Sequence, residues 1–217
     1  KYLKNHWDIS FGVKFVDCLG YIEKYNAIIT RRIKTDFLFE KFRSIDQFGT
    51  SNDVGSNAVK KGLSNFGASL RSFHNRNTQI GKFSVDDFEI KLLKYLDELG
   101  QYGIRSSHLK VIRKNLAKYS GYQCEASLVN NLKGIDLRQI FIDGNELYII
   151  DPGKISTSFA EVDIARFIVT CRILYWGTTA ILRRICPSLS YEQAFLDGYY
   201  NVADRPEKMI NLLIIKE

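Results

Sequence analysis

The sequence has little of what marks a metal-binding or disulfide-bonded protein. Its 217 residues include only four cysteines and three histidines. Cys18, Cys124, Cys171 and Cys186 lie far apart and lack the spacing of a zinc ligand set, and the histidines are not clustered. These absences exclude a zinc site. Scattered cysteines in a chain of this length also predict a reducing compartment.

Runs of basic residues are absent as well. Net charge is +7 and the pI is about 9.1, which favours anionic partners such as nucleotides, nucleic acids and acidic membrane surfaces. The charge is spread along the chain, and no run of five or more Lys or Arg occurs. We therefore expect a solvated basic surface and no nucleic-acid partner. A basic helical module that binds nucleic acid is the weakest alternative.

No segment predicts a membrane span or a secretion signal. The longest apolar stretch, residues 164–184, contains Arg166 and Arg172, which predicts a buried helix and no transmembrane segment. The start of the sequence has no signal-peptide pattern. We expect a cytoplasmic protein, and the sequence does not predict its oligomeric state.

The first half of the chain predicts strands and then helices. Residues 13–33 are rich in β-branched and aromatic residues and break at "EKYN", which predicts two antiparallel strands. A helix is expected from Asp36, a polar loop over residues 48–57, and another helix after a capping box formed by Ser84 and Asp87. Two helix faces are predicted from apolar spacing, one at Val59, Leu63, Phe66, Leu70 and Phe73, the other at Phe88, Leu92, Tyr95, Leu96 and Leu99.

The second half returns to strands before a final helical region. "CEASLVN" predicts a strand, and "RQIFIDGNELYIID" predicts a hairpin with its turn at Asp143-Gly144. Helical spacing resumes after Asp163, and Ser190 is expected to cap a further helix. This order of segments indicates an α+β fold with two unequal lobes.

Four stretches resemble one family, in that family's own order. "LSNFGASLRSFH" resembles a helix ending in Leu-x-x-Leu-His, "IFIDGNELYIIDPG" a hairpin running into a metal-binding Asp, and "EVDIARFI" an Asp-Leu-Ala helix start. "NAIITRRI" is similar to the strand and hinge against which adenine lies. Residues 58–180 thus resemble the C-terminal lobe of the aminoglycoside phosphotransferase and choline kinase-like family.

That resemblance implies a protein kinase-like bilobal fold. Residues 1–34 would be the remnant of a small β N-lobe and hinge. Residues 35–217 would be a mostly helical C-lobe that carries the catalytic loop and a metal-binding hairpin. The family's phosphate-covering loop and nucleotide-pairing Lys precede the strand at residue 13, before which only twelve residues remain. We therefore expect a truncated N-lobe.

The same resemblance implies an ATP- and Mg²⁺-dependent phosphotransferase that acts on a hydroxyl of a small molecule or glycan. Asp151 would be the magnesium ligand, and Gln139, at the place of the family's Asn, would be the second one. The hinge residues Ile29, Thr30 and Arg31 would contact the nucleotide. Without the resemblance, Asp151 is only an Asp in a turn after a strand.

Two further positions follow from the comparison with the family. Asp163 would be a buried carboxylate at a helix start that accepts backbone N–H groups and braces the catalytic loop. His74, at the end of an apolar helix face, is expected to be a structural histidine.

The catalytic base is where the sequence departs from the family. The family's loop reads His-Gly-Asp, four residues, then Asn, yet the residue five before Gln139 is Gly134. With a two-residue insertion the triplet would fall on residues 130–132, which again contain no carboxylate. Asp136 is the only carboxylate in the loop and is our candidate catalytic residue, although a solvated loop charge is the simpler interpretation. An alternative therefore stays open, a catalytically degenerate kinase-like module that binds a nucleotide or a partner.

Overall fold

The structure is a computed structural model that describes most of the chain. The described residues are 7, 9–35, 37–38, 40, 54–143, 146–179, 188–200 and 205–216, without the side chains of 54–56 and 174–190. The helix expected from Asp36 and the hairpin turn at Gly144 therefore lie largely outside the described residues. Residues 54–57, expected to belong to a loop, are already helical.

A three-stranded sheet joins the beginning of the chain to the predicted hairpin. It has the order β1-β7-β6, with β1 (Val13–Phe15) parallel and β6 (Ile140–Asp143) antiparallel to β7 (Glu146–Ile149). The prediction of a hairpin is thus confirmed. Its alternating apolar residues Ile140, Ile142, Leu147 and Ile149 are buried in the same core cluster as the long helix α3 (Val54–His74). Their burial fixes the hairpin on that helix.

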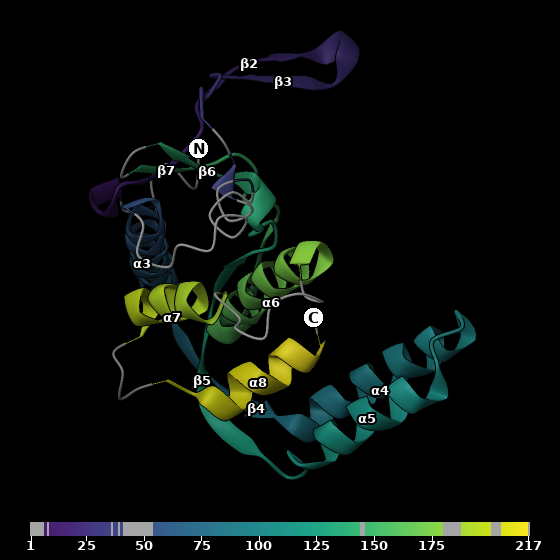
Figure 1. Cartoon of the computed structure of the whole chain (residues 1–217). Helices are drawn as coiled ribbons and strands as arrows, with labels where there is room; N and C mark the ends of the chain where they lie inside the picture. The colour runs from purple at the N-terminus through teal and green to yellow at the C-terminus, as the bar shows by residue number, and fades with distance from the viewer. Residues whose placement is uncertain are drawn as a thin grey trace.

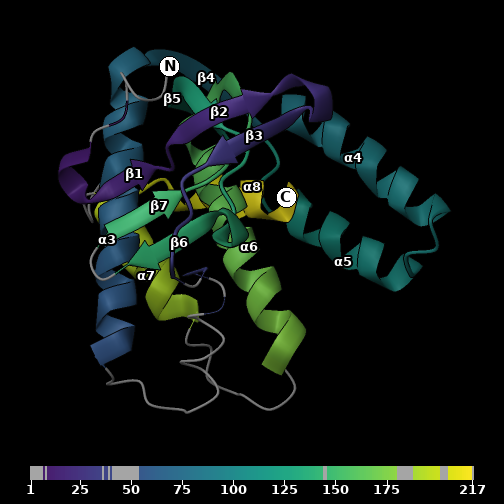
Figure 2. The same ribbon diagram turned by 90° about the horizontal axis from the view of Figure 1, so that it is seen from above.

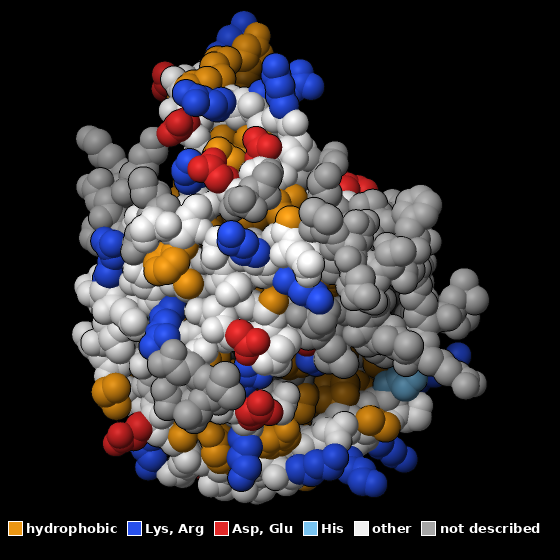
Figure 3. Space-filling view, turned by 60° about the vertical axis from the view of Figure 1, so that its left-hand side comes forward, with side chains coloured by type: hydrophobic (Ala, Val, Ile, Leu, Met, Phe, Trp, Pro, Cys, Tyr) orange, Lys and Arg blue, Asp and Glu red, His pale blue; other side chains and the backbone are white. Residues whose placement is uncertain are grey.

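A separate antiparallel ribbon projects from this region (Figure 1). It consists of β2 (Cys18–Ile22) and β3 (Ala27–Thr30), joined by the 3₁₀ turn η2 (Glu23–Tyr25), so the two predicted strands are confirmed. The expected first strand was too long, because residues 13–15 pair with β7 instead. Most of the ribbon's large apolar side chains are exposed, and Figure 3 shows hydrophobic and basic side chains together on the projecting part.

The second three-stranded sheet has the order β4-β5-β8 and is antiparallel throughout. Its central strand, β5 (Gln123–Leu132), includes the predicted "CEASLVN" segment. Both outer strands, β4 (Gln79–Ser84) and β8 (Ile155–Phe159), were not predicted. The sequence of β8, "ISTSF", is largely polar, and only its pairing with β5 identifies it as a strand.

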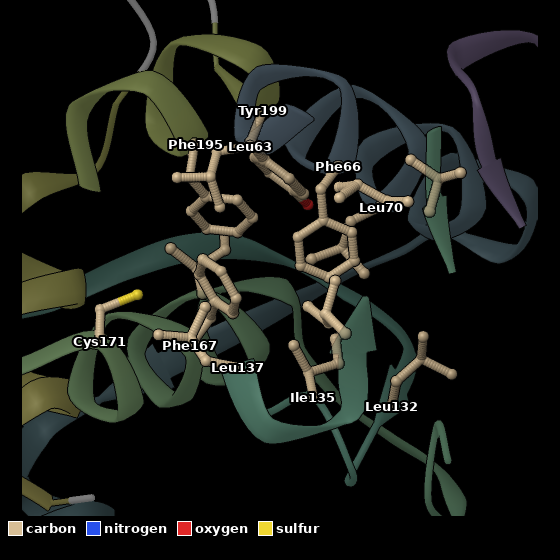
Figure 4. Packing of buried hydrophobic residues seen from close by; sticks show 14 of the residues in the cluster. Leu63, Phe66, Leu70, Leu132, Ile135, Leu137, Phe167, Cys171, Phe195 and Tyr199 are labelled. Atoms are coloured by element: carbon tan, nitrogen blue, oxygen red, sulfur yellow. The ribbon is translucent and has the colours of Figure 1, made fainter. Parts of the chain in front are cut away.

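Helices cover these sheets and form the core. The predicted stripe of α3 is confirmed, since all five of its apolar residues are no more than 3% exposed. In Figure 4, Phe66 of α3 lies beside Phe167 of α6 (Ala160–Thr179) and Phe195 of α7 (Ser188–Tyr199). The ring centroid of Phe66 is 5.2 Å from that of Phe167 and 5.6 Å from that of Phe195, and the last two are 4.4 Å apart. The helix α7 begins at Ser188, so the expected cap at Ser190 is wrong. The last described helix is α8 (Glu207–Lys216).

The crossing of α3 and α7 depends on two glycines. A Cβ added to Gly67 would lie 2.2 Å from the carbonyl oxygen of Phe195, and one added to Gly198 would lie 1.9 Å from that of Ser64. Both distances are far below van der Waals contact. The two helix backbones can therefore approach this closely only because neither position has a side chain.

The helices α4 (Val85–Gln101) and α5 (Ser106–Ala117) form an arm that extends away from the core in both ribbon views (Figures 1 and 2). Ser84 precedes α4, but its side chain makes no capping hydrogen bond, so the predicted capping box is wrong. Leu92 and Leu96 are buried, whereas Tyr95 and Leu99 are 49% and 41% exposed. The predicted stripe is therefore only partly a core face. No helix in the described part of the chain is long and apolar enough to cross a membrane.

Candidate active site

Two loops, residues 133–136 after β5 and residues 150–154 after β7, lie against each other. The N–H of Lys133 donates to the carbonyl of Lys154 at 3.1 Å, and the N–H of Gly134 donates to the carbonyl of Pro152 at 2.9 Å. These bonds continue the pairing of β5 with β8, in which Leu132 is opposite Ile155. The unpredicted strand β8 is therefore what brings the two loops together.

Gln139 and Asp151 lie at the open end of the β6–β7 hairpin, opposite its turn. Gln139 ends the short 3₁₀ helix η4 (Leu137–Gln139), and its carbonyl accepts the N–H of Ile150 at 2.9 Å. This bond extends the ladder one step beyond the pair Ile140 and Ile149. Ile150 is thus opposite Gln139, and Asp151 is the residue after Ile150. The structure therefore brings the two predicted metal ligands to the same end of the hairpin.

The Asp151 side chain is exposed, and its Oδ1 accepts the backbone N–H of Gly153 at 2.8 Å. Gly153 has a φ of +68°, a conformation that favours glycine. It lets the chain turn away directly after Asp151. An exposed carboxylate and a side-chain amide oxygen are hard oxygen donors, which suit Mg²⁺ when substrate phosphates supply further ligands. Among the described residues, no cluster of three His, Cys, Asp or Glu could hold a metal alone.

Gly134, the residue five before Gln139, has no room for a side chain. A Cβ built there would lie 2.5 Å from the nitrogen of Gly153 and 2.6 Å from the carbonyl oxygen of Asp151. No real Cβ comes this close to backbone atoms. The position five before Gln139, where the resemblance implied a catalytic Asp, is thus filled by a contact between two backbones.

Asp136 is held by its neighbour Arg138. Its Oδ1 accepts the backbone N–H of Arg138 at 2.8 Å and the guanidinium Nε at 3.0 Å, which caps η4. Partial burial opposes ionisation, but the hydrogen bonds from Arg138 outweigh it and lower the pKa of the Asp136 carboxyl. A carboxylate with a lowered pKa is a weaker general base.

Asp163 braces the end of β5. It is fully buried in the first turn of α6, and its Oδ2 accepts the backbone N–H of Leu132 at 2.7 Å. Leu132 is the last residue of β5, directly before the loop at 133–136. The carboxylate therefore holds that loop at its root, in the geometry that the family comparison implied.

His74 completes this brace from the end of α3. Its Nε2 lies 3.3 Å from the same Asp163 oxygen, and its Nδ1 lies 2.7 Å from the hydroxyl of Tyr199 on α7. Both ring nitrogens are thus engaged inside the core, where His74 is 1% exposed. The expectation of a structural histidine fits this position. Nothing in the sequence indicated Tyr199, because α7 is separated from α3 by more than a hundred residues.

The predicted hinge residues lie at the end of the ribbon that begins after β1, where the N–H of Val16 donates to the carbonyl of Ile149 at 2.9 Å and the N–H of Arg31 donates to the carbonyl of Asp17 at 3.1 Å. Arg31 lines a cavity of about 700 Å³ together with Lys14, Arg32, Asp143 and Tyr148. Ile29 and Thr30 belong to the exposed ribbon and do not line it. Neither Asp151 nor Gln139 lines it. The structure therefore does not bring the predicted nucleotide and metal residues into one described cavity.

Comparisons with known proteins give a fold and no family. No family model and no curated protein matches the sequence. Among solved structures, the chain is similar to glucosamine kinase in crystal form B, with a TM-score of 0.59 and 12% identity over 87% of this chain and 55% of that one. Glucosamine kinase in complex with glucosamine, ADP and inorganic phosphate gives the same TM-score and identity over 86% of this chain and 55% of that chain.

A thermostable mutant of the aminoglycoside phosphotransferase APH(4)-Ia, in its apo form, has a TM-score of 0.52 and 12% identity over 99% of this chain and 71% of that one. The chain spans about half the length of the glucosamine kinases, 55% of each. At this identity the likeness concerns the fold alone. The chain has an α+β, kinase-like fold, as predicted from its sequence.

Proposed function

We propose that the protein uses ATP and Mg²⁺ to transfer the γ-phosphate to a hydroxyl of a small molecule or glycan. The observation that carries this proposal is the position of Asp151, one residue beyond the hairpin ladder and beside Gln139. The loop at 133–136 lies against the same turn. The glucosamine and ADP named for one structural neighbour support a sugar-like acceptor and a nucleotide donor.

In this proposal Asp151 and Gln139 hold the metal ion through oxygen atoms. Bound magnesium would supply neutralisation of the phosphate charge. Ile29, Thr30 and Arg31 hold the base of the nucleotide. They belong to the proposed remnant of the N-lobe and hinge, residues 1–34, which precedes the proposed helical C-lobe, residues 35–217. Rate would come from positioning and from charge neutralisation, without a covalent intermediate.

Asp136 is the residue that we propose to orient the acceptor hydroxyl. Its hydrogen bonds to Arg138 leave it ionised over a wide pH range, which suits a carboxylate that accepts a hydrogen bond. To accept the hydroxyl it has to exchange part of its contact with Arg138. Orientation is thus a better role for Asp136 than strong proton abstraction.

One observation favours the second candidate, a catalytically degenerate kinase-like module. Gly134 stands where the family has its base, and its backbone contact with Asp151 and Gly153 excludes any side chain. Such a module would bind a nucleotide through Asp151 and would transfer no phosphate. Binding and turnover therefore have to be measured separately.

The first measurement is the unfolding midpoint with ATP, with Mg²⁺, and with both. We expect a stabilising shift that requires both and that disappears in Asp151→Ala. Asp97→Ala, an exposed carboxylate on α4, is the matched control and should keep the shift. A shift that survives in Asp151→Ala would contradict the proposed metal site.

The second measurement is ADP formation with a panel of sugar and amino-alcohol acceptors that includes glucosamine. Acceptor-dependent ADP release that is lost in Asp136→Asn supports the phosphotransferase. Magnesium-dependent ATP binding without ADP release from any acceptor supports the degenerate module.

A further inference from the structure

The cavity of about 700 Å³ that Arg31 lines has one wall formed by a strap, residues 31–35, between the ribbon and β6. At one end of the strap the N–H of Arg31 donates to the carbonyl of Asp17 at 3.1 Å. At the other end the hydroxyl of Thr35 donates to the carbonyl of Ile142 at 2.6 Å. The strap is therefore held at both ends, and all of its residues except Thr35 line the cavity.

The rest of the lining is partly apolar. It includes Trp7, Phe15 and Tyr148. The basic side chain on this side, Lys14, is already paired, since its Nζ lies 2.5 Å from Oε1 of Glu146. The volume is within the range of small-molecule sites, and the apolar side chains suit the organic part of a ligand.

The basic side chains of the strap, in contrast, have no partners of their own. Arg31, Arg32 and Lys34 are exposed, and within the part of the chain that the structure describes their side chains make no ion pair or hydrogen bond. The lining contains two carboxylates, Asp17 and Asp143, against these three cations and the paired Lys14. The cavity therefore has an excess of positive charge, which favours an anionic ligand.

We propose that this cavity binds a small organic phosphate monoester, whose phosphate group pairs with Arg31, Arg32 and Lys34. Such a group carries about −1.5 to −2 charges at pH 7 and has three strong acceptor oxygens. A guanidinium group can meet phosphate oxygens with two parallel hydrogen bonds. Inorganic phosphate offers the same charge without the organic part, so a comparison of the two ligands separates these sources.

Four small molecules test the proposal in the absence of ATP and Mg²⁺: benzyl phosphate, benzyl alcohol, benzylammonium and inorganic phosphate. The first three have the same ring and differ in charge. Binding is measured by ligand-observed NMR and by the shift of the unfolding midpoint, titrated through the millimolar range. We expect benzyl phosphate to bind and to stabilise the protein, inorganic phosphate to bind more weakly, and the other two not to bind. Added salt should weaken the binding of benzyl phosphate, because the cations are exposed.

Variants of the lining locate the site. Arg32→Gln and Lys34→Gln each remove one cation, so the affinity for benzyl phosphate should fall about threefold in each and further in the double variant. Asp143→Asn removes a negative charge from the lining and should raise the affinity. Lys110→Gln, on α5 and outside the cavity, lowers the net charge equally and should bind as the wild type does. All four positions are exposed, so the variants should fold.

No binding of benzyl phosphate, equal binding of benzylammonium, or an unchanged affinity in the double variant would overturn the proposal. An equal loss in Lys110→Gln would overturn it as well. Inorganic phosphate that binds as tightly as benzyl phosphate would assign the site to the free ion and overturn the organic ligand. Arg31, shared with the proposed nucleotide contacts, stays unchanged in these variants. No readout needs ATP, Mg²⁺ or turnover, so a failure here is distinguishable from a failure of the proposed function.

Discussion

The buried carboxylate of Asp163 accepts the backbone N–H of Leu132, 31 residues earlier in the chain, at 2.7 Å. One side chain of α6 thereby fixes the last residue of β5 and the start of the loop at 133–136. His74 approaches the same oxygen from α3. Three elements that are distant in sequence thus meet at one acceptor beside the candidate active site.

Removal of this acceptor should destabilise the fold. Asp163→Ala leaves the N–H of Leu132 and the ring of His74 without their common partner inside the core, and we expect a loss of about 3 kcal/mol in the free energy of unfolding. Urea denaturation measures it. Asp163→Asn keeps an acceptor oxygen and should lose less. The exposed Asp97→Ala should change stability by no more than about 0.5 kcal/mol, and equal losses in all three would contradict the brace.

The glycine contact between α3 and α7 gives a prediction of opposite kind, in which an added methyl group destabilises. Gly198→Ala places its Cβ on the Ser64 carbonyl, and we expect a loss of about 1–3 kcal/mol or more by urea denaturation. Gly62→Ala, in helix α3, meets only side-chain atoms, those of Leu147 at 3.4 Å and of Ile142 at 3.5 Å, and gains helix propensity. That control should be close to neutral, and a neutral Gly198→Ala would show that the two helices pack less closely.

A carboxylate introduced by Gly134→Asp, at the position where the resemblance implied a catalytic Asp, should not act as a catalytic base. The new Cβ would push on the backbone of Asp151 and Gly153, so the turn that presents Asp151 has to move. We expect a lower unfolding midpoint and a smaller or absent stabilisation by ATP with Mg²⁺. A gain in acceptor-dependent ADP release over the wild type would instead show that the loop rearranges to accept a side chain.

Glu161 predicts a pH dependence of stability. Burial raises its pKa in the folded protein above the value in the unfolded chain, so the folded state binds more protons across that interval. Its contribution to stability is therefore greatest below the unfolded pKa and declines as the pH rises toward the folded one. Glu161→Gln removes this dependence, and its stability relative to the wild type should rise with pH over the same interval. Urea denaturation at several pH values measures the difference, which a flat result would refute.

Local sequence patterns correctly predicted the elements whose apolar residues recur at a regular period and lie on one buried face. The stripe of α3 and the alternation in β6 and β7 were confirmed because burial follows directly from the period of the chain. The strands β4 and β8 were missed because each is defined by its pairing with β5, which no local window contains. Tyr95 and Leu99 on α4 have the spacing of a core face but no neighbour to cover them.

The candidate site, too, could be predicted only where local sequence motifs identify its residues. Asp151, Gln139 and Asp163 were identified as candidate site residues from sequence motifs, and the structure brings Asp151 and Gln139 to the same end of the hairpin. The contact of Gly134 with Gly153 joins two loops that are distant in sequence, so residue spacing could not predict it. The pairing of Asp136 with Arg138 is local, but it depends on side-chain conformations that the sequence does not specify. Whether Asp136 is catalytic, and whether Ile29, Thr30 and Arg31 meet a nucleotide, remain predictions.

The strand β5 begins at Gln123, close to the foot of the α4–α5 arm, and ends at Leu132, where Asp163 grips it. Ten residues of extended chain are about 33 Å long. The arm and the loop are therefore connected to the two ends of one strand, which pairs with β4 over residues 123–128 and with β8 over residues 128–132. The α4–α5 arm and the candidate active site are thus joined by one continuous strand that is paired over its whole length.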